Sequence, residues 1–290
     1  MIQKRSSLIV LFLATLALSS LAQVEMPAYR LYNDQGESLV FSDLVKTAKD
    51  QDLVLFGELH NNPINHWLQL ELMRALVADE NLAVGGEMFE VDDQIVLNEY
   101  LRDQIKLEHL KKEAKLWPNY DTDYAPLVEL AKTEGIPFVA TNVPRRYASL
   151  VSREGQARLL ELEGAAQFLP TLPFEVAATD RGYVEMKAMM GAHSHGMSMD
   201  LFIEAQALKD YTMASNIVRH MPENGVFLHF NGSFHSQYRA GIVGYLQSLK
   251  PELNILVISA VEADALAFNQ EWSQLGDIIL VTPTRLTKTH

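Results

Sequence analysis

Two short motifs of the same form come after apolar runs in this chain. Gly57-Glu58-Leu59-His60 follows the run 53–56, and Gly232-Ser233-Phe234-His235 comes after the run 226–230. Short runs rich in Val, Leu and Phe are typical of strands that a parallel sheet buries on both faces. Open sheets of this kind bind ligands at the carboxyl ends of their strands. We therefore expect an α/β fold in which both histidines reach one ligand site.

Strand-like runs alternate with helix-like stretches along most of the chain. Beyond the two runs above, we predict strands at 82–84, 137–141, 255–261 and 277–281, and a β-hairpin at 29–32 and 38–41. A helix is expected after Asn62 and Pro63, which are a typical N-cap residue and first helical residue. This alternation predicts a mostly parallel sheet with helices on both faces.

The alternation lapses between about residues 154 and 199. We expect that segment to form a small helical subdomain outside the sheet. It would be inserted into one α/β domain that spans residues 23–290. A chain of 290 residues is long enough for one such domain with a large core.

The first residues are predicted to direct export rather than to join the fold. Lys4 and Arg5 precede an apolar stretch at 8–18, and Ser20-Leu21-Ala22 forms a cleavage signal of small residues. These features are typical of a Sec signal peptide, here spanning residues 1–22. A signal anchor that stays attached is the alternative. We therefore expect a periplasmic protein, and not a lipoprotein, because the chain has no cysteine to carry a lipid.

Composition limits both the chemistry and the partners of this chain. Since cysteine is absent, any metal must be held by His, carboxylate, Tyr or Met side chains. The formal net charge of −13 disfavours nucleic acids and anionic membrane surfaces as partners. An anionic ligand stays compatible with that charge where a local basic cluster holds it.

Polar side chains are concentrated where the predicted strands end. Glu58 and His60 follow the first core strand, Glu87 follows the second, and His235 follows the strand at 226–230. Two imidazoles and two carboxylates at one edge could ligate Zn, Mn or Fe, or act as general acid and base without a metal. Each residue alone is better explained as a helix cap or a locally hydrogen-bonded group, whereas the whole group at successive strand ends favours a functional site. Further polar residues at strand ends are Glu90, Asn142, Asn231 and Glu262.

A second feature, the stretch 186–199, combines five methionines with His193 and His195. Thioether and imidazole groups are ligands of haem iron and copper, and methionine also lines flat apolar ligands. A helical hairpin whose methionines only fill gaps is the alternative. Other candidates for haem contact are His66, the phenols of Tyr120, Tyr124, Tyr147 and Tyr183, and three arginines that could pair with propionates, Arg145, Arg146 and Arg181.

Several motifs resemble those of one bacterial family. The run 57–66, the segment 86–90 with Gln94, and the segments 124–127, 142–145, 206–214 and 231–235 are similar, in this order, to motifs of the ChaN-like haem-binding proteins. The resemblance covers about residues 45–250. It implies an α/β domain with a small helical domain, a role in haem uptake, and haem held between two subunits. This family resembles a wider group that includes the Tiki and TraB proteins and the erythromycin esterases. Some members of that group are metal-dependent peptidases, and others hydrolyse esters with a His and Glu pair. The resemblance therefore also implies hydrolase activity as an alternative.

The sequence thus predicts an exported haem-binding protein of iron acquisition, which forms a homodimer and works with an outer-membrane haem receptor. The residues predicted to contact haem are His60, His66, Tyr124, Arg145, His193, His195 and His235. The alternative function is a hydrolase of esters or peptides, metal-dependent or His/Glu-dependent. Its catalytic or metal-binding residues would be Glu58, His60, Glu87 and His235.

Overall fold

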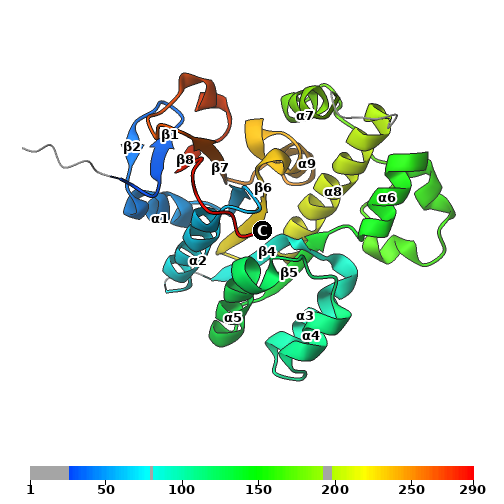
Figure 1. The fold of residues 1–290 in the computed structure, drawn as a ribbon. Coiled ribbons are helices and arrows are strands. Elements are labelled where there is room, and N and C mark those ends of the chain that lie inside the picture. The colour runs from blue at the N-terminus through cyan, green and yellow to red at the C-terminus, as the bar shows by residue number, and fades with distance from the viewer. Residues whose placement is uncertain (1–25, 79–80, 192–197) are drawn as a thin grey trace, which may run out of the picture.

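A single sheet organises the structure, a computed structural model that describes residues 26–78, 81–191 and 198–290 (Figure 1). The described residues form an eight-stranded sheet with the order β2-β1-β8-β7-β3-β6-β4-β5. Strands β3 to β8 are parallel, and the β1–β2 hairpin pairs antiparallel with β8 at one edge. The strand bounds are β1 Arg30–Asn33, β2 Ser38–Leu39, β3 Leu53–Glu58, β4 Leu82–Glu90, β5 Phe138–Asn142, β6 Val226–Gly232, β7 Ile255–Ala263 and β8 Ile278–Pro283.

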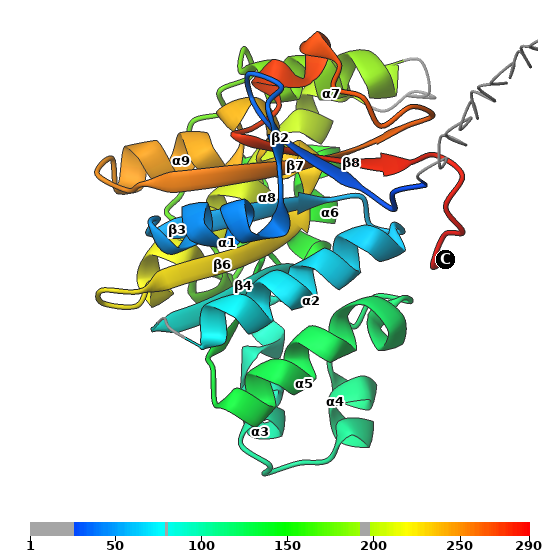
Figure 2. The same ribbon diagram turned by 90° about the vertical axis from the view of Figure 1, so that its left-hand side faces the viewer.

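Helices cover both faces of the sheet, which confirms the predicted fold class. In Figure 2, α1 and α2 lie on the near face, while α8 and α9 lie behind the strands. The helix bounds are α1 Phe41–Lys49, α2 Pro63–Val77, α3 Gln94–Leu101, α4 Leu107–Glu113, α5 Ala125–Glu134, α6 Arg145–Glu154, α7 Arg181–Gly191, α8 Met199–His220 and α9 Ile242–Leu249.

The central strands are apolar throughout because each face packs against helices. In β3, Val54 and Phe56 belong to the buried cluster of α1, α2 and α5. Their neighbours Leu53 and Leu55 belong to the cluster of α8 and α9 on the opposite face. Successive side chains of a strand point to opposite faces, so one unbroken apolar run serves both layers.

Helix α2 begins where the sequence indicates. The Asn62 side chain accepts hydrogen bonds from the backbone N–H groups of Ile64 at 3.0 Å and Asn65 at 3.2 Å, and Pro63 is the first helical residue. This cap fixes the path of the chain between β3 and α2. The short loop at 59–62, which carries His60, is therefore anchored at its carboxyl end.

Strand β4 is longer than predicted, since it runs to Glu90 rather than ending at Val84. All nine of its residues are buried between β5 and β6, and its register shifts between Gly86 and Glu90, which pairs with Asn142. Glutamate is uncommon in buried strands, so composition alone does not reveal this extension. As a result, Glu87 and Glu90 lie within the strand and not in the loop after it.

The segment between α6 and α8 contains two short 3₁₀ helices, at 156–161 and 165–168, followed by α7. Its apolar residues pack with α6 and α8 in a separate cluster that includes Val151, Leu159, Tyr183 and Leu208. His193 and His195 lie outside the described residues, as does the predicted signal peptide at 1–22. Among residues 26–78, 81–191 and 198–290, no helix is long and apolar enough to cross a bilayer.

Candidate functional site

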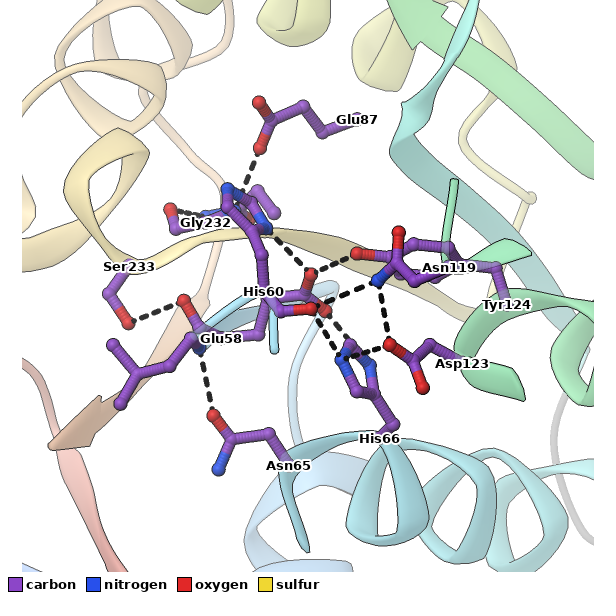
Figure 3. Close-up of polar contacts among 12 residues, drawn as sticks. Glu58, His60, Asn65, His66, Glu87, Asn119, Asp123, Tyr124, Gly232 and Ser233 are labelled. Carbon is purple, nitrogen blue, oxygen red and sulfur yellow. Dashed lines mark hydrogen bonds and ion pairs between the residues drawn. The ribbon is translucent and has the colours of Figure 1, made fainter. Parts of the chain in front are cut away.

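Three neighbouring strands bring the two Gly-x-x-His motifs together. Strand β6 lies between β3 and β4, and its Gly232 is in register with Glu58 of β3. The carboxyl ends of these strands therefore place Glu58, His60, Glu87 and the 232–235 turn at one edge of the sheet (Figure 3). The sequence predicted this convergence from the strand ends alone.

Glu58 is a buried carboxylate at the centre of this edge. Its Oε1 accepts hydrogen bonds from the Tyr124 hydroxyl at 2.7 Å and from His60 Nδ1 at 2.9 Å. Its Oε2 accepts one from the Gln69 amide at 2.5 Å. Burial alone would raise the pKa of Glu58, but the hydrogen bond from His60 and the charge of His66 outweigh it, so the pKa lies below its ordinary value. Glu58 is therefore an anion that positions its neighbours.

The His60 imidazole is oriented by Glu58 and is partly exposed. A carboxylate only accepts, so His60 Nδ1 carries the hydrogen and Nε2 holds the lone pair of the neutral ring. The side chain is 43% exposed, and the edge of its ring packs on Trp117 with centroids 5.0 Å apart. Burial lowers the pKa of His60, yet the hydrogen bond to Glu58 and the charge of Glu87 raise it above its ordinary value. Glu58 thus holds Nδ1, while Cε1 and Nε2 of the ring face Gly232 of β6.

The second imidazole, His235, is fully enclosed by carboxylates. Its Nδ1 lies 2.5 Å from Asp210 Oδ1 of α8, and its Nε2 lies 3.2 Å from Glu87 Oε1. Tyr183 of α7 donates its hydroxyl hydrogen to Asp210 at 2.6 Å. Glu87 Oε2 accepts the backbone N–H of Gly232 at 2.8 Å. Burial lowers the pKa of His235, but the charges of Glu87 and Asp210 dominate and raise it to about 10. His235 is therefore an imidazolium that joins β6, β4 and α8.

The shifted pKa values of this buried ion pair predict a pH dependence of stability. Because the pKa of folded His235 is raised from 6.5 to about 10, its contribution is complete below pH 6.5 and is lost as the pH rises through 10. Glu87 has a lowered pKa, so its contribution is complete above about pH 4.5 and is lost on acidification. Urea unfolding measures the free energy of unfolding of wild type and of His235→Gln. The difference between the two proteins should shrink from pH 6.5 to pH 10. The expected loss is about 1.4 kcal/mol for each unit by which the folded and unfolded pKa values of His235 differ. A constant difference over that range would contradict the assignment.

A third set of side chains holds the backbone of His60. Asn119 Nδ2 donates to the His60 carbonyl oxygen at 3.0 Å, and His66 Nε2 lies 3.0 Å from the same oxygen. Asp123 accepts from Asn119 at 2.6 Å and lies 3.3 Å from His66 Nε2. His66 is buried, so the structure places it beneath His60 rather than at the surface.

The other predicted site residues are distributed as follows. Tyr124 reaches the site, but its buried hydroxyl is bonded to Glu58. Arg145 is exposed at the start of α6, where Arg146 pairs with Asp92 at 2.6 Å. Four other candidates contact neighbouring side chains or backbone. Glu90 lies 3.5 Å from Lys115, and Glu262 pairs with Lys288. Asn142 donates to the carbonyl of Glu87, and Arg181 stacks on Tyr238.

The divalent metal site anticipated from Glu58, His60, Glu87 and His235 is not supported. Among the residues that the structure describes, no group of three or more His, Asp or Glu side chains is arranged to hold a metal ion. Both oxygens of Glu58 and both oxygens of Glu87 already face hydrogen-bond donors. His235 likewise faces a carboxylate on each ring nitrogen, so it offers no free ligand atom.

Four residues of the site were not singled out from the sequence: Gln69, Asn119, Asp123 and Asp210. Asp210 stands inside the segment 206–214 whose motif carries the family resemblance. Asp123 directly precedes Tyr124, in a turn of π-helix at 120–124. No periodicity indicates which face of such helical segments meets the sheet edge, so only the packed structure reveals these partners.

The sequence profile of the family described as "Haem-binding uptake, Tiki superfamily, ChaN" matches residues 44–246, which is more than half of the chain. The chain therefore belongs to this haem-binding family. Among curated proteins, RETICULATA-RELATED 5, a chloroplastic protein of Arabidopsis thaliana, is 25% identical over 201 residues, or 64% of this chain. The match covers 27% of that protein, so this chain spans about a quarter of its relative's length.

Two solved structures have a similar fold. ChaN of Campylobacter jejuni, described with cofacial haem binding, has a TM-score of 0.68 and 18% identity, over 88% of this chain and 96% of that chain. A succinoglycan biosynthesis protein has a TM-score of 0.52 and 12% identity, over 84% of this chain and 90% of that chain. These similarities confirm the α/β fold, and the family profile confirms the predicted ChaN-like membership.

Proposed function

We propose that this chain is an exported haem-binding protein of iron acquisition, and that haem binds beside His60 at the carboxyl edge of the sheet. One observation carries the proposal: in a chain of a haem-binding family, a half-exposed imidazole has its Nδ1 held by a buried carboxylate, which leaves Nε2 as its ligand atom. A carboxylate behind an imidazole is the usual support of a metal-ligating histidine.

The surroundings of His60 fit a flat, mainly apolar ligand. Trp117 and the His60 ring pack in a T-shaped pair, and Phe234, which is 37% exposed, lies two residues after Gly232, which contacts that ring. Exposed aromatic side chains are favourable contacts for a porphyrin face because they bury large apolar areas. His60 would hold bound haem, which would supply an iron centre that an imidazole nitrogen can ligate. The chain itself binds the ring, orients His60 and keeps Nδ1 protonated.

Hemin titration of the purified protein, followed by the Soret band, tests this proposal. We expect saturable binding by wild type, about a hundredfold weaker binding by His60→Ala, and about tenfold to hundredfold weaker binding by Glu58→Gln, which alters the support of the ligand. His109→Ala is the matched control, because His109 is a half-exposed imidazole of α4 outside the site. Absence of a saturable Soret change in wild type at micromolar protein would refute haem binding.

The hydrolase alternative rests on the same Glu58–His60 pair. An imidazole whose Nδ1 is held by a carboxylate can accept a proton from water at Nε2, which is the role of a general base. The metal-dependent form of this alternative lacks a suitable ligand group among the described residues. If hemin fails to bind, and wild type but not His60→Ala hydrolyses p-nitrophenyl esters, the hydrolase becomes the better description.

Export, dimerisation and a receptor partner complete the proposed role. Export is supported by the signal-peptide features of residues 1–22. A homodimer that shares haem is what the resemblance to ChaN-like proteins implies, and an outer-membrane haem receptor would fit an exported carrier. We propose the periplasm as the location on these grounds.

A further inference from the structure

The chain after β8 returns to the loop that carries His60. Residues 284–290, here called the strap, run back across the carboxyl edge of the sheet (Figures 1 and 2). The backbone N–H of Thr289 donates to the Asn61 carbonyl oxygen at 3.1 Å. The strap therefore contacts the residue directly after His60.

Two side chains of the strap anchor it to the site. The Thr289 hydroxyl donates to Asp123 Oδ2 at 2.7 Å. Lys288 forms an ion pair with Glu262, whose Oε1 also accepts from the Asn62 side chain at 2.8 Å. One anchor thus leads through Asp123 and Asn119 to His60, and the other leads through Glu262 to Asn62.

Asp123 connects the strap to His60 itself. Its Oδ2, which accepts from Thr289, also accepts from Asn119 and lies close to His66 Nε2. Asn119 and His66 in turn hold the His60 carbonyl oxygen from two directions. Asp123 is almost fully buried, so losing one of its donors leaves a charged oxygen with fewer partners away from solvent.

The strap is held mainly by these polar contacts. None of residues 284–290 is fully buried, and four of them are exposed. Segments with few buried apolar contacts open at low free-energy cost. Opening of the strap should therefore cost less free energy than unfolding of the sheet.

We propose that residues 284–290 and Asp123 are positioning elements for His60: the attached strap fixes the 59–62 loop, and its release frees the imidazole from its haem-binding orientation. The link to haem rests on the proposed function, whereas the link between strap and loop does not. Occupancy at His60 and attachment of the strap would then favour each other, which makes the strap a regulator of this site.

Hydrogen exchange of the full-length apoprotein tests the positioning role. The amides of Leu59 and Asn62 report on the loop, since they donate to Asn65 Oδ1 at 2.8 Å and to the Leu59 carbonyl at 2.9 Å. Thr289→Val keeps the shape of the side chain and removes its donor. We expect it to accelerate exchange at both amides about tenfold, the factor that corresponds to ~1.4 kcal/mol, while Thr289→Ser restores the wild-type rate.

Thr287→Val is the matched control, since it makes the same change at an exposed position of the strap. Equal exchange in Thr289→Val, Thr287→Val and wild type would overturn the proposal. Faster exchange of Thr289→Val throughout β3 and β6, in addition to the loop, would also overturn the proposal. Such a result would indicate that the variant is destabilised as a whole.

A second readout uses hemin itself. Thr289→Val should release hemin about tenfold faster than wild type and shift the Soret maximum, whereas Thr289→Ser should not. If wild type binds no hemin, the proposed function fails while the exchange result still decides the positioning role. If wild type binds hemin and Thr289→Val releases it at the wild-type rate, the regulatory link is refuted.

Discussion

Gly232→Ala should weaken hemin binding by about a hundredfold and leave the fold intact. A Cβ atom at Gly232 would lie 2.8 Å from both Cε1 and Nε2 of His60, closer than such atoms approach. The backbone of Gly232 has φ −59° and ψ 141°, a conformation that alanine adopts freely. The substitution therefore acts only through the steric clash of the new Cβ with His60. The half-exposed His60 ring has to move and lose its hydrogen bond to Glu58.

Gly244→Ala is the control for this substitution. Gly244 lies in α9, where an added Cβ would meet Asp180 at an ordinary 3.4 Å, and alanine is the better helix former. Its hemin titration should match wild type. Urea unfolding of both variants separates loss of binding from loss of stability. If Gly232→Ala binds hemin as tightly as wild type, binding does not depend on the observed position of the His60 ring. That result would contradict the proposal that His60 ligates haem iron.

Asp210→Ala should destabilise the protein by about 3–5 kcal/mol, the usual loss when one partner of a buried ion pair is removed. Asp210 is fully buried, and its two oxygens accept from Tyr183 and face His235. Without it, a protonated imidazole and a phenol hydroxyl lose their partner in a region that water does not reach. Urea unfolding at pH 6.5, where His235 is protonated in the folded protein, measures the loss.

Asp200→Ala provides the comparison on the same helix. Asp200 is 86% exposed and pairs with Lys187 at the surface. Exposed ion pairs contribute at most about 1 kcal/mol, so this variant should stay close to wild type. If Asp210→Ala is no less stable than Asp200→Ala, the carboxylate cage around His235 does not stabilise the fold.

The fold was predictable where burial is reflected in sequence. The apolar runs at 53–56, 226–230 and 255–261 all became central strands, because strands covered on both faces require apolar residues throughout. The prediction was wrong about the length of β4, in which Gly86 and the two glutamates resemble a loop. Their burial depends on pairing with β5 and β6, which are distant in sequence.

The site was predictable to the extent that it follows strand ends. Glu58, His60, Glu87 and His235 converge because parallel strands end at one edge. Asp210 and Asp123 act from helical segments, and which side of a helix faces an edge is decided by packing across the whole domain. The assignment of Tyr124 to haem and of His193 and His195 to cofactor contact stays a prediction, although the Tyr124 hydroxyl is bonded to Glu58.

The place of β6 between β3 and β4 has a consequence for synthesis of the chain on the ribosome. Proteins emerge from their amino-terminal end, so β3 and β4 are made well before the strand that separates them. Until residues 226–232 have been translated, β3 lacks both of its neighbours, β6 and β7, and its backbone edges are open to wrong pairing. The two edges of β3 therefore stay unpaired until the second histidine motif has been made, and the cofactor edge that this motif completes cannot form before then.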